Sequence, residues 1–305
     1  MSVNKKSNFM NNLGLDPSVG NRMGFIETVD DTLILYRAAL KSKIAAEASF
    51  EETLIMRNII EHLKRSDLYH LDTQFDDMLL DYSQQYEGLN TSEVRFSEFT
   101  RPPSRKCYIR LNSIEKYLNH ETDIVNVGFI TEYFEDKVTK VTMCAPFASP
   151  FLVGAYHPQK GIVEATTNGR TGTAISDAIE FNMNILIMVA GAFELINNPR
   201  FTVSETAGTR AQRKQMKREQ DIALEAWHKI SWNVDEDIVE IGDGDRGGWH
   251  MPLHYTRGHP RKAEPHWDDV MYKDGKPYIW IHGFWSGHPA YGIKRGYHAP
   301  KLKAS

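Results

Sequence analysis

The chain of 305 residues carries a formal net charge of −4, with 41% hydrophobic and 25% charged residues. This composition is close to the average of globular proteins, so it excludes a fibrous or intrinsically disordered class and allows one large domain or two ordinary ones. The two cysteines, Cys107 and Cys144, form no CxxC pair, which excludes a disulfide framework and a cysteine-based zinc finger.

The N-terminal half has the pattern of helices. Residues 1–24 are rich in Asn, Ser and Gly and predict a flexible lead, without the apolar run of a signal peptide. From about Thr28 to Gly88 apolar residues recur at intervals of three and four, which is the spacing of one helix face. The Arg-Pro-Pro-Ser segment at 101–104 interrupts this pattern.

The middle of the chain changes period. Residues 138–143, 151–157 and 161–166 have the character of strands, and a turn at 158–161 joins the last two, which predicts a small antiparallel sheet. The most apolar segment, Ile175–Ile196, ends at Asn-Asn-Pro and predicts a buried helix. Its apolar run is shorter than the roughly 20 residues of a membrane span and contains a glutamate. No membrane contact is expected, and the expected location is the cytoplasm.

These patterns together predict an α+β fold. It has a helical N-terminal half with a small antiparallel sheet, in a mixed domain over residues 25–208, and a basic β-rich module over residues 249–305. Residues 209–248 are expected to form a basic helix and linker between them. The run TRAQRKQMKRE at 209–219 makes Arg213 and Lys214 candidates for phosphate contacts, and the alternative is a solvated helix face.

The C-terminal module is set apart by its composition. Residues 249–305 hold nine basic and four acidic residues, a net charge of +5, whereas the preceding 248 residues carry −9. Seven of the twelve histidines and four of the six tryptophans also fall in this stretch. A basic end on an acidic body predicts a polyanionic partner.

Within this module, residues 253–259 and 278–285 are predicted to pair as strands, and Asp274-Gly275 predicts a hairpin turn. Guanidinium groups bind phosphate oxygens, imidazoles donate hydrogen bonds or carry protons, and aromatic rings stack on unpaired bases. The sequence therefore predicts a nucleic-acid-binding surface. Its candidate residues are Arg257, His259, Arg261, Lys262 and Trp280, with Arg213 and Lys214 outside the module.

Three alternatives remain open at this stage. The first is an RNase-like enzyme of the toxin type that hydrolyses a phosphodiester with His259 and His282 as acid and base while Arg257 stabilises charge. The second is an interaction factor that binds a host or phage protein through the acidic N-terminal half. The third is that the histidines and tryptophans only pack a small hairpin core.

Motifs for other chemistry are missing from the sequence. There is no Walker loop, Rossmann GxGxxG, hydrolase GxSxG or kinase signature, and no HExxH, so neither a cofactor nor a metal is expected. A metal site of His254 or His266 with Asp268 or Asp269 has no short-spaced motif behind it.

One pattern in the module is similar to a known signature. An HxxRGHxR motif is followed by a basic stretch and a Trp-Ile pair, and is formed here by His254, Arg257, Gly258, His259, Arg261, Trp280, Ile281 and Gly287. Together with the preceding apolar helix and basic run, this resembles the C-terminal signature of a broad, uncharacterised family of phage, plasmid and actinobacterial proteins. The chain departs from that family at Gly283 and Phe284, where the family shows Pro and His. The resemblance implies a phage or mobile-element origin and names no reaction.

Overall fold

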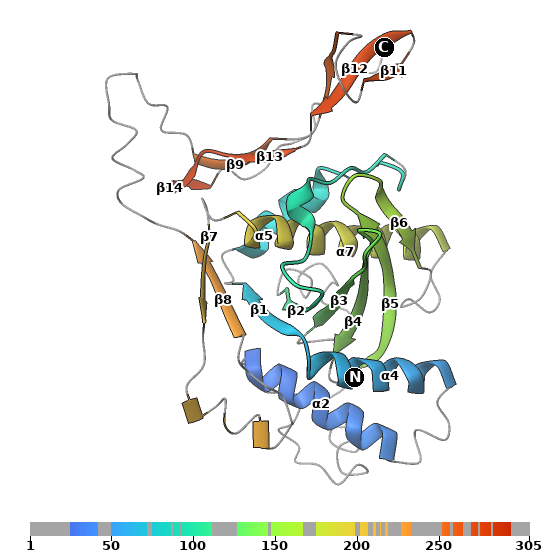
Figure 1. The fold of residues 1–305 in the computed structure, drawn as a ribbon, viewed down its shortest axis with the longest axis vertical. Coiled ribbons are helices and arrows are strands. Elements are labelled where there is room, and N and C mark those ends of the chain that lie inside the picture. Colours follow the sequence, from blue (N-terminus) through green and yellow to red (C-terminus); the bar gives the residue numbers. More distant parts are fainter. Residues whose placement is uncertain are drawn as a thin grey trace.

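The computed structural model is built on an eight-stranded mixed sheet that lies between two layers of helices (Figure 1). Helices α2 (Phe25–Lys41) and α4 (Phe50–Leu63) cover one face, and α5 (Asp76–Gln84) and α7 (Ile175–Ile196) cover the other. The structure describes residues 25–41, 50–71, 75–86, 88–91, 93–111, 127–145, 148–166, 175–198, 202–206, 210–211, 214, 217–218, 227–232, 252–256, 259–264, 270–273, 275–281 and 283–293.

The strand order of this sheet is β6-β5-β4-β3-β2-β1-β8-β7. The central strand β1 is parallel to both of its neighbours, β2 and β8, and the remaining pairs are antiparallel. The strands are β1 (Asp67–Leu71), β2 (Lys106–Arg110), β3 (Gly128–Tyr133), β4 (Thr139–Ala145), β5 (Ala148–His157), β6 (Gly161–Ala165), β7 (Thr202–Thr206) and β8 (Trp227–Trp232).

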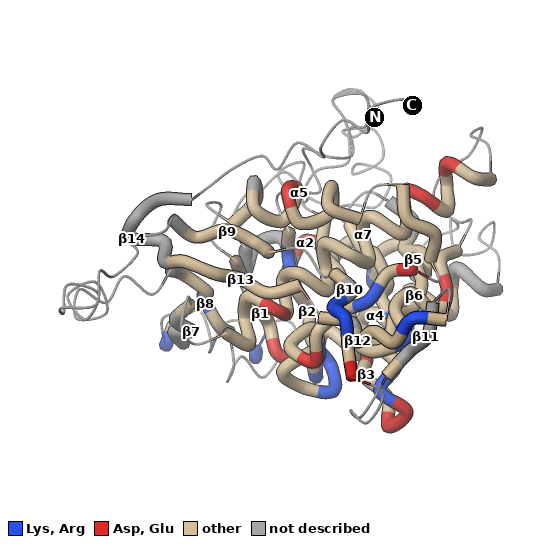
Figure 2. Tube along the Cα trace, turned by 90° about the horizontal axis from the view of Figure 1, so that it is seen from above, with Lys and Arg blue, Asp and Glu red and all other residues tan. Residues whose placement is uncertain are grey.

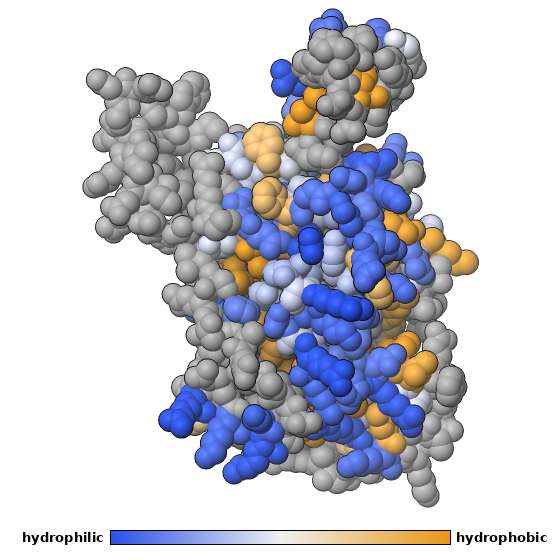
Figure 3. Space-filling view, in the orientation of Figure 1, coloured by the Kyte–Doolittle hydropathy of each residue, from blue (hydrophilic) through white to orange (hydrophobic). Residues whose placement is uncertain are grey.

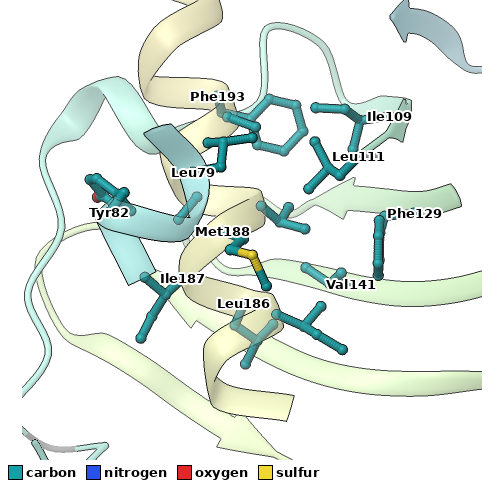
Figure 4. Close-up of a cluster of buried hydrophobic side chains, with 14 of the residues drawn as sticks. Leu79, Tyr82, Ile109, Leu111, Phe129, Val141, Leu186, Ile187, Met188 and Phe193 are labelled. Atoms are coloured by element: carbon teal, nitrogen blue, oxygen red, sulfur yellow. The ribbon is translucent and has the colours of Figure 1, made fainter. Parts of the chain in front are cut away.

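Helix α7 forms the centre of the larger core. It is apolar around most of its circumference, and such a helix is stable only when its surroundings cover it. Met188 and Leu186 face Phe129 and Val141 of the sheet, as Figure 4 shows, and α5 packs along another side together with the 3-10 turn η2 (Glu98–Thr100). By length and composition α7 could also cross a membrane, but most of it is buried inside the protein.

The opposite face has a smaller core. Leu33 and Tyr36 of α2 and Leu63 of α4 pack on side chains of the sheet, including Ile130. The Tyr36 hydroxyl donates to the carbonyl of Ala145 at 3.2 Å and accepts from the Ala145 amide at 3.3 Å, which ties α2 to the end of β4.

The C-terminal residues form two further three-stranded sheets. One sheet, which we call the base, has the order β13-β9-β14, and the other, which we call the arm, has the order β10-β12-β11. In Figure 1 the base lies beside α5 and the arm projects away from the body. The strands are β9 (Pro252–Thr256), β13 (Phe284–Ser286) and β14 (His288–Ile293) in the base, and β10 (His259–Lys262), β11 (Met271–Lys273) and β12 (Lys276–Ile281) in the arm.

The expected fold class is wrong. The stretch from Thr28 to Gly88, predicted as helical, contains β1, which lies in the middle of the large sheet, and the longest helix is in the second half of the chain. The expected small antiparallel sheet, β4 to β6, is only one end of a mixed sheet. Strand β1, Asp-Leu-Tyr-His-Leu, is only five residues long and mixes polar and apolar residues without strict alternation, so its period does not distinguish it from a helical segment.

Several local predictions are confirmed. Strands β4, β5 and β6 and the turn between the last two lie where the alternation placed them, and α7 has the predicted bounds Ile175–Ile196. The predicted hairpin is formed by β11 and β12, with Lys273 opposite Lys276 and Gly275 at φ +73°, while Asp274 lies outside the described residues. A positive φ is the conformation that glycine adopts without strain.

Candidate functional site

The arm carries several of the residues that the sequence predicts to bind nucleic acid. His259, Arg261 and Lys262 are all exposed on β10. In the antiparallel ladder with β12, His259 lies opposite Ile281 and Arg261 opposite Ile279. Successive side chains of a strand point to opposite faces, and directly opposed residues share a face. His259 and Arg261 therefore lie on one face of the arm.

Lys262 belongs to the other face. It lies opposite Tyr278, which is half-buried, and the alternation of β12 places the exposed Lys276 on that same face. Trp280 pairs with Pro260 in the ladder. Its position therefore lies on the same face of the arm as Lys262 and on the opposite face from His259. The single surface expected from sequence is thus divided over the two faces of a thin sheet.

The cations of the arm are accessible. Among the described residues, Arg261, Lys262 and Lys276 form no ion pair with an acidic side chain, and Glu264, which follows Lys262 by two residues, is also exposed. Figure 2 shows lysine and arginine along β10 and near β11, and Figure 3 shows hydrophilic and apolar side chains next to each other on the arm. Such a surface can bind a polyanion through phosphate contacts.

Other predicted residues are not brought to the arm or lie outside the described residues. Arg257, His282 and Arg213 fall outside them, so their positions relative to His259 are not given. Lys214 is exposed and helical, in the connection between β7 and β8. Lys214 thus belongs to a segment other than the arm strands β10 to β12.

No metal centre is found in the described part of the chain, where no three His, Cys, Asp or Glu side chains come together in a way that could hold an ion. Both described cysteines are buried, and burial raises the pKa of the Cys107 thiol to about 11. A thiol that stays protonated at neutral pH is a poor nucleophile.

The structure also shows a polar cluster that sequence analysis did not single out. Glu194 is buried in α7, and Tyr82 of α5 donates its hydroxyl to Glu194 Oε2 at 3.1 Å. The Tyr86 hydroxyl lies 3.4 Å from the hydroxyls of both Tyr82 and Tyr255, so a chain of hydroxyls leads from the carboxyl group to the base. The signal in the sequence was Glu194, the one carboxylate in the otherwise apolar run 185–196 of this helix, where burial of charge is costly.

Burial decides the ionisation of this carboxyl group. Desolvation raises the pKa of Glu194 to about 7, and the hydrogen bond from Tyr82 opposes that rise only in part. The aromatic rings of Tyr255 and Trp285, from β9 and β13, pack edge-to-face at 5.1 Å between their centroids. Tyr255 also packs edge-to-face on Tyr82 at 4.8 Å, so the base covers this part of α5.

The arm and the cluster differ in chemical character. The arm offers exposed cations for a polyanion, and the cluster offers one titratable group shielded from water by aromatic rings. Comparisons with models of protein families, with curated proteins and with solved structures find no match for this chain.

Proposed function

We propose that the protein binds nucleic acid through the arm. The observation that carries the proposal is the exposure of Arg261, Lys262 and Lys276 on a thin sheet that projects from the body. These side chains serve both faces of the arm, and the C-terminal residues 249–305 that contain it carry a net charge of +5.

The physical basis is neutralisation of phosphates. Cations that contact the phosphate backbone release condensed counterions, and this release supplies most of the sequence-independent affinity. The arm has three strands about 4.8 Å apart, so it is wider than the two-stranded ribbon that a groove of about 12 Å admits, and its cations are suited to contact phosphates along the edge of a groove. The half-buried Tyr278 between two lysines on one face is equally suited to stacking on an unpaired base.

The proposal extends to biological origin and location. The resemblance of the HxxRGHxR pattern to proteins of phages and plasmids supports an accessory role in a phage or mobile element. Such a protein would meet its nucleic acid in the cytoplasm, which is the host cytoplasm if a phage encodes it.

The test is the salt dependence of binding. If three cations contact phosphates, the affinity should fall by roughly 20- to 40-fold between 50 and 200 mM salt, with the larger loss for a duplex. Fluorescence anisotropy with labelled duplex and single-stranded DNA and RNA measures this directly. An affinity that does not change with salt rejects the proposal.

A matched pair of variants locates the surface. The double variant Arg261→Gln, Lys262→Gln should lower the slope of log affinity against log salt by about 1.8 for a duplex, because two phosphate contacts are lost. The control is Lys140→Gln, Lys160→Gln, which removes the same charge from exposed positions on the body. An equal effect of the two double variants would show that net charge, and not the arm, governs binding.

The alternatives give different outcomes in the same assays. His259→Ala should leave most of the affinity in a binding protein, whereas a hydrolytic enzyme should lose cleavage of the labelled strand. A protein-binding factor should retain its partner in a pull-down from nuclease-treated lysate, where a nucleic-acid bridge would be destroyed.

A further inference from the structure

The base is docked on the body through a small set of contacts. Leu253, Tyr255 and Trp285 are its buried residues in the larger core, where they join α5 and α7. Among the described strands, none of the base pairs with a strand of the eight-stranded sheet, so these side chains and not a β-ladder hold the base in place. Because β9 continues into β10, and β12 into β13, after two residues each, the base also sets where the arm points.

The docking contacts surround a buried carboxyl group. Tyr255 of β9 reaches Tyr86, whose hydroxyl also approaches Tyr82, and Tyr82 donates to Glu194 at 3.1 Å. Trp285 of β13 stacks over Tyr82 with 6.5 Å between ring centroids. The environment of Glu194 is therefore built jointly by the body and the base.

The groups that face Glu194 are neutral at ordinary pH. They are Tyr82 of α5, the Ser97 hydroxyl just before η2 and, through its electrostatic effect, Tyr255 of β9. No charged side chain among the described residues lowers the pKa of Glu194, which burial raises to about 7. Ionisation near neutral pH therefore places an uncompensated negative charge in the core, which is costly unless water reaches it.

Of the elements that bury Glu194, the base should detach at the lowest free energy. The body side of α7 is fixed by many fully buried side chains, such as Leu186, Met188 and Phe193, that pack against the eight-stranded sheet and α5. Among the residues whose burial is described, which exclude those of β14, the base contributes the three buried side chains of Leu253, Tyr255 and Trp285, and its β9–β14 ladder has a register irregularity. Elements with few buried apolar contacts open at lower free energy than the core.

We propose that Glu194 and the Tyr82–Tyr86–Tyr255 hydroxyl chain form a proton-sensitive latch that holds the base, and with it the arm, on the body. With Glu194 protonated the base is docked; ionisation of Glu194 favours an open state in which water solvates the carboxylate. The latch is a property of the chain itself and does not depend on whether the arm binds nucleic acid.

Hydrogen exchange followed by mass spectrometry tests the latch. Peptides covering β9 and β13 report opening of the base, peptides covering β4 and β5 report the body, and each is expressed as protection relative to the intrinsic rate at that pH. Protection of β9 and β13 should fall roughly tenfold between pH 6 and pH 8, as expected for a carboxyl group whose pKa is about 7 when docked and 4.5 when open. Protection of β4 and β5 should stay constant.

Two variants of matched chemistry complete the experiment. Glu194→Gln cannot ionise and should abolish the pH dependence in the base, whereas Glu164→Gln, an exposed position on β6, should leave it unchanged. The proposal is overturned if the wild-type base shows no pH dependence, if Glu194→Gln retains it, or if base and body lose protection together.

A further variant covers the case in which Glu194→Gln does not fold. Tyr255→Phe keeps the ring and removes the hydroxyl that ends the chain, so opening of the base should increase several-fold while β4 and β5 stay protected. An unchanged base in Tyr255→Phe would equally overturn the latch.

Discussion

Replacing Glu194 by glutamine should stabilise the protein at high pH and have little effect at low pH. In the folded chain the pKa of Glu194 is about 7, and the ordinary value is 4.5. Below pH 4.5 the carboxyl group is neutral in both the folded and unfolded states. As pH rises from 4.5 through 7 the unfolded state releases its proton first, so the wild type loses stability.

The magnitude follows from the two values. The difference between a pKa of about 7 and one of 4.5 corresponds to about 3 kcal/mol when the whole range is crossed, and to about 2–3 kcal/mol between pH 5 and pH 8. Glutamine stays neutral and keeps an amide oxygen that can accept from Tyr82. The variant should therefore not show this pH-dependent loss of the free energy of unfolding.

Urea denaturation monitored by far-UV circular dichroism at pH 5, 6, 7 and 8, at constant ionic strength, measures the effect. The free energy of unfolding of Glu194→Gln minus that of the wild type should rise by about 2–3 kcal/mol over this range. Taking the difference cancels other titrating groups, such as His62, whose pKa is lowered chiefly by burial. A difference that stays flat from pH 5 to pH 8 would refute the assignment of a buried, neutral carboxyl group.

Three further predictions concern single positions. A Cβ at Gly283 would overlap the Tyr255 hydroxyl and ring, so Gly283→Ala should destabilise the protein by about 1–3 kcal/mol in urea denaturation, and an unchanged midpoint would contradict this packing. Tyr36→Phe should cost about 1–3 kcal/mol, because the Ala145 amide and carbonyl both lose a buried partner; a neutral effect would show that water replaces it. Burial raises the pKa of Cys144 to about 12, so its thiol should resist alkylation at pH 8 until denaturant unfolds the chain, and fast labelling of the native protein would place it at the surface.

The sequence predicted those parts of the fold whose signal is local. Strands β4 to β6 alternate and are joined by short turns, and α7 is a long segment that is apolar around most of its circumference, which is the pattern of a buried helix. Strands β1, β2 and β8 depend on partners far away in the chain. The parallel pairing of Tyr69 with both Ile109 and His228 produces no periodic pattern in the sequence. Burial in the folded protein determines that β1 forms a strand, and it outweighs the helical pattern around this segment.

The candidate site could be predicted in composition but not in arrangement. The basic character of the C-terminal residues and the pairing of two strand segments follow from charge and turn chemistry, and the structure pairs β10 with β12. The faces depend on register: a single step in the ladder moves every side chain to the opposite side. For this reason Lys262 shares a face of the arm with Tyr278, whereas His259 and Arg261 share the other face with isoleucines of β12. The cluster around Glu194 could not be predicted from the sequence, because its tyrosines come from segments more than a hundred residues apart.

The position of β1 has a consequence for synthesis on the ribosome. Its neighbour β2 follows soon after it, but its other neighbour, β8, is completed only at Trp232, roughly 160 residues after β1 ends. At ordinary elongation rates of about 5–20 residues per second, the open edge of β1 waits roughly 8–30 s for its partner. During that interval the nascent chain exposes the unpaired amides and carbonyls of a strand destined for the interior, which makes this edge the place where a chaperone is most needed.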